Sequence, residues 1–123
     1  MASSLSFTLP YPDPVLSPNS SKRHWRYKQA AKELSRSNGY YLSFRQAGAF
    51  DGIKELQMKI VFFPPTAIRR DLDNAFSSMK SAIDGLCKGL GIDDAQIRRT
   101  VLECGPVMSG GQVNIELSQK KSK

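Results

Sequence analysis

The stretch KELQMKIVFFPP, residues 54–65, constrains the fold more than any other part of the chain. Apolar side chains recur at every second position, with two more on the opposite face: Leu56, Met58, Ile60 and Phe62, then Val61 and Phe63. A period of two is that of a β-strand with one face in the core. The Pro64–Pro65 pair ends the strand, because proline has no N–H to donate to a ladder. This segment is therefore the clearest strand in the chain.

The remaining elements follow from similar patterns. Alternation over residues 4–9 predicts a first strand, and residues 96–104 and 112–117 predict two more, joined as a hairpin by a turn at 105–111. Helices are expected over about residues 21–37, stopped by Asn38–Gly39, and over about 73–90. Residues 11–21 are a proline-rich loop, and 39–52 a short helical or irregular stretch. The order β-α-β-α-β-β predicts an α+β (mixed α/β) fold, a small mixed sheet covered by helices.

The length of 123 residues predicts a single domain, 1–123, with a flexible basic tail from about residue 118. The sequence has no apolar run long enough to span a membrane and no pattern of a signal peptide, so a cytoplasmic protein is expected. Cys87 and Cys104 lack the spacing of a zinc site or a disulfide framework. We expect two reduced thiols.

A formal charge of +7 favours a nucleic acid or an anionic surface as partner. The basic residues of the segment 21–32 surround three aromatic rings: Lys22, Arg23, Arg26, Lys28 and Lys32 around His24, Trp25 and Tyr27. Cations interleaved with rings suit DNA, since the cations meet phosphates while the rings stack on bases. The alternative is an amphipathic helix that buries Trp25 in the core and leaves the cations in solvent.

Five of the eleven acidic residues lie between residues 69 and 94, and the segment begins with Arg69 and Arg70. On a helical wheel Phe76, Met79, Ile83, Leu86 and Leu90 form the core stripe, and Asp73, Lys80 and Asp84 share one edge. Carboxylates that converge from a helix start and a strand start form an oxygen site of the kind that Mg²⁺ or Mn²⁺ prefers. Helix capping is the alternative, and it explains one aspartate well.

The motif RRDLDN, followed by a helix with a lysine and IDGL and then by GIDDAQI, resembles the RusA family of Holliday junction resolvases, which phages and prophages often encode. The resemblance covers nearly the whole chain, in order. It implies a homodimeric, Mg²⁺-dependent (or Mn²⁺-dependent) crossover junction endodeoxyribonuclease that acts in DNA recombination and repair, in a bacterial or phage-infected cell. The DNA substrate would be a four-way junction.

The resemblance assigns catalysis and metal binding to Asp71, Asp73 and Asp94, with Asp93 as the alternative to Asp94. The metal would activate water for an in-line displacement at the phosphate. The family's helix lysine falls on Ser77, and Lys80 matches only if the helix start carries three extra residues. Lys80 would offset charge in the transition state.

The DNA-binding residues expected from the sequence are Lys22, Arg23, Trp25, Arg26, Lys28, Arg69 and Arg70. The two arginines beside the acids would offset their repulsion of DNA. Two other functions remain open on the sequence: a non-catalytic basic DNA-binding module, and a nuclease of the same fold that cleaves other branched DNA.

Overall fold

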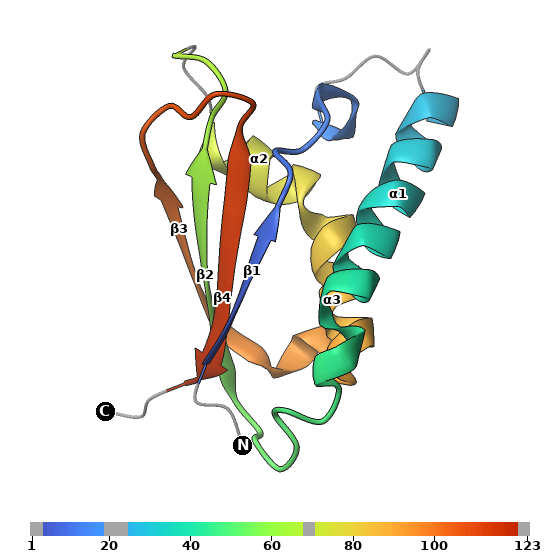
Figure 1. Ribbon diagram of the computed structural model, residues 1–123, viewed down its shortest axis with the longest axis vertical. Helices are drawn as coiled ribbons and strands as arrows, with labels where there is room; N and C mark the ends of the chain where they lie inside the picture. Colours follow the sequence, from blue (N-terminus) through green and yellow to red (C-terminus); the bar gives the residue numbers. More distant parts are fainter. Residues whose placement is uncertain (1–3, 19–24, 68–70, 121–123) are drawn as a thin grey trace.

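The computed structural model describes residues 4–18, 25–67 and 71–120. Its elements are β1 (Ser4–Leu9), η1 (Pro14–Leu16), α1 (Trp25–Ser43), η3 (Phe44–Gln46), β2 (Leu56–Phe63), α2 (Leu72–Ser78), α3 (Lys80–Leu90), η4 (Asp94–Gln96), β3 (Ile97–Cys104) and β4 (Gln112–Gln119). A four-stranded mixed sheet is covered on one face by α1, α2 and α3 (Figure 1). The α+β fold class and the order β-α-β-α-β-β are confirmed.

The strands lie in the order β1-β4-β2-β3. β4 is antiparallel to both of its neighbours, and β3 is parallel to β2. The predicted hairpin of the last two strands is therefore wrong, because β2 lies between them. The turn at 105–111 instead crosses the end of β2, where the Gly105 N–H donates to Phe62 O at 2.7 Å and the Met108 N–H to Pro64 O at 2.9 Å.

Burial explains why β4 is a central strand and β3 an edge strand. Val113, Ile115 and Leu117 of β4 are at most 1% exposed. β3 carries Arg99 and Glu103, which are exposed, and charged side chains are tolerated at the edge of a sheet. The core lies between the sheet and the helices. It includes the predicted apolar face of β2 and most of the predicted apolar face of the second helix: Leu56, Met58, Ile60, Phe62, Met79, Ile83, Leu86 and Leu90.

α1 does not stop at Asn38–Gly39 as predicted but continues to Ser43. Gly39 is buried where α1 crosses α3, and a methyl group there would overlap Ala82 O. On α3, Gly85 meets Arg36 O in the same way. Ser43 Oγ is buried in this contact, 2.9 Å from Gly39 O and 3.1 Å from Leu86 O. The glycine that was interpreted as a helix stop is thus a contact point between two helices.

The end of the chain also differs from its prediction. β4 runs to Gln119, and the Lys120 N–H donates to Glu55 O at 3.0 Å, so the predicted tail from about 118 begins inside the sheet. Residues 121–123 lie outside the described residues. Among the helices in the described part of the chain, none has the length and apolar character needed to cross a membrane.

The helix crossing predicts an unusual response to alanine. In an ordinary helix Gly→Ala stabilises by about 1 kcal/mol. Gly85→Ala is expected to lower the free energy of unfolding by about 1–3 kcal/mol instead, because its methyl group meets the backbone of α1. Urea unfolding measures the change. Gln29→Ala, at an exposed position of α1, is the control and should shift stability by less than about 0.5 kcal/mol. A Gly85→Ala protein as stable as the wild type would contradict the close crossing.

Candidate functional site

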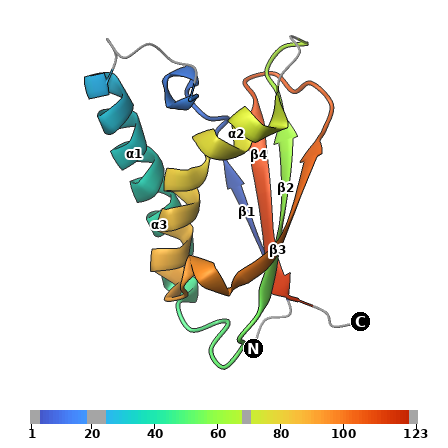
Figure 2. The same cartoon turned by 180° about the vertical axis from the view of Figure 1, so that it is seen from behind.

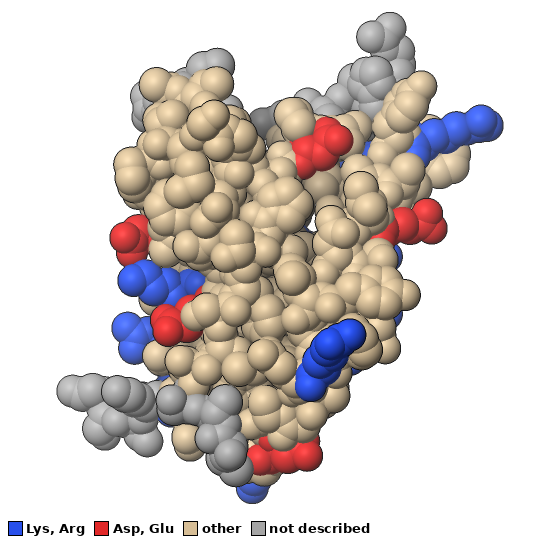
Figure 3. Space-filling view, viewed as in Figure 1, with Lys and Arg blue, Asp and Glu red and all other residues tan. Residues whose placement is uncertain are grey.

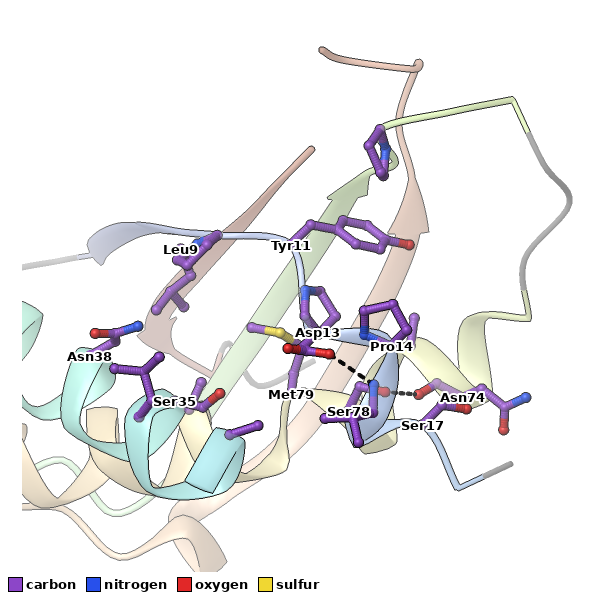
Figure 4. Close-up of a pocket in the computed structure, with 18 of the residues that line it drawn as sticks. Leu9, Tyr11, Asp13, Pro14, Ser17, Ser35, Asn38, Asn74, Ser78 and Met79 are labelled. Carbon is purple, nitrogen blue, oxygen red and sulfur yellow. Dashed lines mark hydrogen bonds between the residues drawn. The ribbon is translucent and has the colours of Figure 1, made fainter. Parts of the chain in front are cut away.

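A groove of about 1440 Å³ lies between α1, α2 and the proline-rich segment that follows β1. Figure 4 shows Tyr11 and Pro14 of that segment on one side and Ser35 and Asn38 of α1 on the other. Tyr11 is held there by an edge-on contact with Phe62, with ring centroids 6.4 Å apart. Most of the lining is apolar or small, and its two acidic residues are Asp13 and Asp71.

Asp71 and Asp73 lie at the start of α2, and Asp71 lines this groove. Asp71 caps the helix, since its Oδ1 accepts the Asp73 N–H at 2.9 Å. Asp73 is in the first turn, and both side chains are exposed. The positive end of the helix dipole favours both charges there. Capping therefore accounts for Asp71, while the Asp73 carboxylate has no hydrogen bond or ion pair with another described residue.

The predicted helix 73–90 is two helices that change direction at Met79 (Figure 2). The Met79 N–H donates to Phe76 O at 2.9 Å, a tightened turn that ends α2. The prediction that Asp73, Lys80 and Asp84 share one edge of a helix required a continuous helix, and it is wrong. Asp84 instead pairs with Arg36 Nε of α1 at 2.8 Å and with Lys88 Nζ at 3.7 Å.

Lys80 is the first residue of α3, and its side chain is exposed. Its Nζ lies over the ring of Phe76, 5.9 Å from the centroid. The side chain therefore points back toward α2, the direction expected for a helical lysine. Ser77, the other candidate for the family's lysine position, is half-buried.

The second acidic pair follows α3, after the left-handed Gly91 that ends this helix. Asp93 caps η4: its Oδ1 accepts the Ala95 N–H at 2.9 Å, and Gln96 Oε1 accepts the Asp93 N–H at 2.8 Å. Asp94 is exposed and has no hydrogen bond or ion pair with another described residue. Of the two alternatives left open by the sequence, Asp94 is the one whose carboxylate is not used in a cap.

The two acidic pairs lie at opposite ends of the domain (Figures 1 and 2). α3 alone, with 11 residues, separates them by about 16 Å. Because β3 is parallel to β2, it begins at the end of the sheet opposite to the one where β2 ends and the chain proceeds to α2. The predicted convergence of Asp71, Asp73 and Asp94 is therefore wrong for one chain. Within the described ranges, no group of three or more acidic, histidine or cysteine side chains is arranged to hold a metal ion.

The basic residues divide into those that the structure describes and those that it does not. Lys22, Arg23, Arg69 and Arg70, with His24, lie outside the described residues. Trp25 is 60% exposed at the start of α1, so the alternative that buries it in the core is wrong. Arg26 is exposed beside it, while Lys28 is half-buried, and its Nζ donates to Ser17 O at 3.3 Å. Lys28 thus ties α1 to the proline-rich segment.

Several surface residues were missed by the sequence interpretation. Tyr40, Tyr41 and Phe44 form an exposed aromatic cluster, with Tyr40 stacked on Phe44 at 5.7 Å. The predicted stop at Asn38–Gly39 placed them beyond the helix, although the absence of proline after Gly39 was a signal that α1 continues. Tyr11 and Asn74, which line the groove, were not predicted as site residues, although Asn74 belongs to the RRDLDN motif.

The environment of Cys87 shows how negative the far end of α3 is. Burial is the main reason that the pKa of the Cys87 thiol rises to about 12, and the charges of Asp94, Asp84 and Asp93 contribute in that order. These residues surround a hollow of about 530 Å³ that Lys88 and Gln96 also line. Cys87 and Cys104 are both free thiols, as predicted, and Cys104 is exposed.

Comparisons with known proteins found one relative by sequence, whose function is not described. A protein described as uncharacterized from Xylella fastidiosa (strain Temecula1) is 32% identical over 118 residues, which is 92% of this chain and 75% of that protein. No family model matches the chain. The hydrogenase maturation protein HypE in complex with ATP aligns with 98% of this chain and 30% of its own, at 10% identity and a TM-score of 0.36. That score is too low to support an argument about fold or function.

The two thiols should differ in reactivity. A pKa of about 12 leaves roughly one Cys87 in ten thousand ionised at pH 8, and the thiolate is the reactive form. A thiol reagent at pH 8 should therefore modify one cysteine per native chain quickly and the second only after unfolding in guanidinium. Cys104→Ser should remove the fast reaction. Fast modification of native Cys104→Ser protein would show that Cys87 is accessible.

Proposed function

The chain belongs to the same family as the uncharacterized Xylella fastidiosa protein, and we propose that it is a structure-selective, metal-dependent endodeoxyribonuclease of the RusA type. It resolves Holliday junctions by paired nicks, in DNA recombination and repair, within the cytoplasm of a bacterial or phage-infected cell. One observation carries the proposal. Two exposed carboxylates of the RRDLDN motif, Asp71 and Asp73, stand at the start of α2, and Asp71 borders the large groove.

The Mg²⁺ or Mn²⁺ ligands in this proposal come from two subunits. Within one chain Asp94 lies at the opposite end of α3 from Asp71 and Asp73, so these three residues do not fit one ion. In a homodimer, Asp71 and Asp73 of one subunit would be joined by Asp94 of the partner subunit. Each dimer then has two equivalent sites, related by the two-fold axis, which suits the two matching strands of a four-way junction.

The chain's own cations would position the DNA. Arg26 and Trp25 are exposed at the start of α1, at the end of the domain where α2 also begins (Figure 1). Lys22, Arg23, Arg69 and Arg70 belong to the segments that lead into these two helices. Arginine and lysine side chains would contact phosphates, and Trp25 would stack on an unpaired base near the branch. Lys80, which points back toward α2, would offset charge on the scissile phosphate.

The decisive assay offers the protein three DNA substrates with Mg²⁺ or Mn²⁺: a synthetic four-way junction, a fork and a linear duplex. Paired nicks in the junction alone are expected. Cleavage of the fork as readily as the junction would favour a nuclease for other branched DNA. Binding without cleavage of any substrate would favour the non-catalytic module.

Asp73→Asn is expected to slow junction cleavage by more than about 100-fold, or ~2.7 kcal/mol of transition-state stabilisation. Junction affinity should stay the same or increase, because the substitution removes a negative charge and leaves the basic surface unchanged. Asp51→Asn makes the same chemical change at an exposed loop position and should cleave like the wild type. Cleavage by Asp73→Asn at the wild-type rate would remove this residue from the site.

Mixing two inactive variants tests whether the site is shared. Asp73→Asn and Asp94→Asn proteins are unfolded together and refolded, so that half of the dimers carry one subunit of each. If the carboxylates come from different subunits, each mixed dimer regains one intact site, and roughly a quarter of wild-type nicking sites return. If they belonged to one subunit, every site would keep one substitution and the mixture would stay inactive.

A further inference from the structure

β3 leaves one long edge of the sheet open. It pairs with β2 along one side, and no described strand lies along the other. The strand has eight residues, and Val101, near its middle, is 39% exposed. An edge of unpaired N–H and C=O groups with an apolar side chain is a template for another strand.

The other edge strand, β1, is shorter and better protected. Its exposed face carries Ser4, Ser6 and Thr8, and its two most buried side chains, Phe7 and Leu9, belong to the core. Leu5 of β1 and Leu102 of β3 are both half-buried, but β3 in addition exposes Val101 on its other face. Of the two edges, β3 is therefore the one with apolar surface that the domain itself does not cover.

The charges of β3 are self-complementary. Arg99, Val101 and Glu103 share the face of the sheet away from the helices, as their β2 partners Gln57, Lys59 and Val61 show. Glu103 is 3.4 Å from Lys59 Nζ on that face. The bulge at Arg98 precedes this regular part of the strand. Figure 3 shows acidic and basic side chains together along the edge that β3 forms.

We propose that two copies of this chain associate by antiparallel pairing of their β3 strands, centred on Val101. In that register Arg99 of each chain lies opposite Glu103 of the partner subunit, and the two Val101 side chains face each other. A register shifted by two residues places Glu103 opposite Val101 of the partner and loses both charge pairs. Opposite charges across an antiparallel pair stabilise it and like charges destabilise it, so this one register is selected.

The pairing also relates the two acidic pairs, a consequence that rests on the proposed function. η4 (Asp94–Gln96) leads directly into β3. When two β3 strands run antiparallel, the start of each lies beside the end of the other. Asp94 of the partner subunit therefore comes to the end of the sheet where α2 begins with Asp71 and Asp73.

Charge reversal tests the register through the dimer dissociation constant, measured by sedimentation of the full chain. The wild type is expected to be a dimer. Arg99→Glu and Glu103→Arg each place like charges opposite one another and should raise the dissociation constant by at least about tenfold. The double variant Arg99→Glu/Glu103→Arg restores opposite charges and should dimerise like the wild type. Arg98→Glu, a charge reversal at the bulge outside the pattern, is the control and should leave dimerisation unchanged.

A monomeric wild type, or a double variant as weak as the single ones, would overturn the proposal. Cross-linking gives a second readout that does not depend on charge. In a Cys104→Ser background, Val101→Cys places two thiols at cross-strand distance, Cβ atoms about 5 Å apart, and mild oxidation should give a covalent dimer. Val107→Cys, at an exposed position of the loop after β3, should not cross-link.

These outcomes separate the interface from the activity. A dimer that follows the charge pattern but cleaves no junction keeps the interface and removes the proposed nuclease. If Arg99→Glu and Glu103→Arg leave both the dimer dissociation constant and junction cleavage unchanged, the proposed interface is wrong and the proposed nuclease activity stands.

Discussion

The close crossing of α1 and α3 is the contact on which the rest of the domain depends. Gly39 of α1 and Gly85 and Gly89 of α3 let the two backbones touch, and a methyl group at any of them would overlap the other helix. Beside this contact Arg36 and Asp84 form an ion pair at 2.8 Å. Backbones this close leave no room for the helices to slide, so the crossing fixes where α1 lies over the sheet.

The position of α1 in turn creates the groove. The helix packs against α3 over its second half, while Tyr27 and Leu34, nearer its start, line the groove and are 70% and 63% exposed. The opposite wall is the proline-rich segment, which Lys28 joins to α1 through Ser17 O. The fold therefore brings the basic start of α1 and the acidic start of α2 to the same end of the domain (Figure 1).

Features that depend on local periodicity were predicted correctly from the sequence. Features that depend on contacts between distant parts of the chain were not. The strand at Leu56–Phe63 and the core stripe of Met79, Ile83 and Leu86 were predicted correctly, because alternation and helical spacing report burial directly. Gly39 was interpreted as a helix stop because its role is a contact with a helix more than forty residues away. The hairpin was expected because sequence neighbours usually pair, yet β4, whose Val113, Ile115 and Leu117 are fully buried, lies between β1 and β2 inside the sheet.

The acidic residues do not meet within one chain for a topological reason. The same reason indicates how they could meet in a dimer. They were expected to meet because a helix start and a strand start were assumed to lie at one end of the sheet. A parallel β2 and β3 place those starts at opposite ends, and no change within one chain reverses β3. A two-fold axis through the β3 edge does reverse it. The open edge and the separation of Asp94 from Asp73 therefore have one origin, the parallel placement of β3 at the border of the sheet, and the self-complementary charges of that strand suit the two-fold pairing.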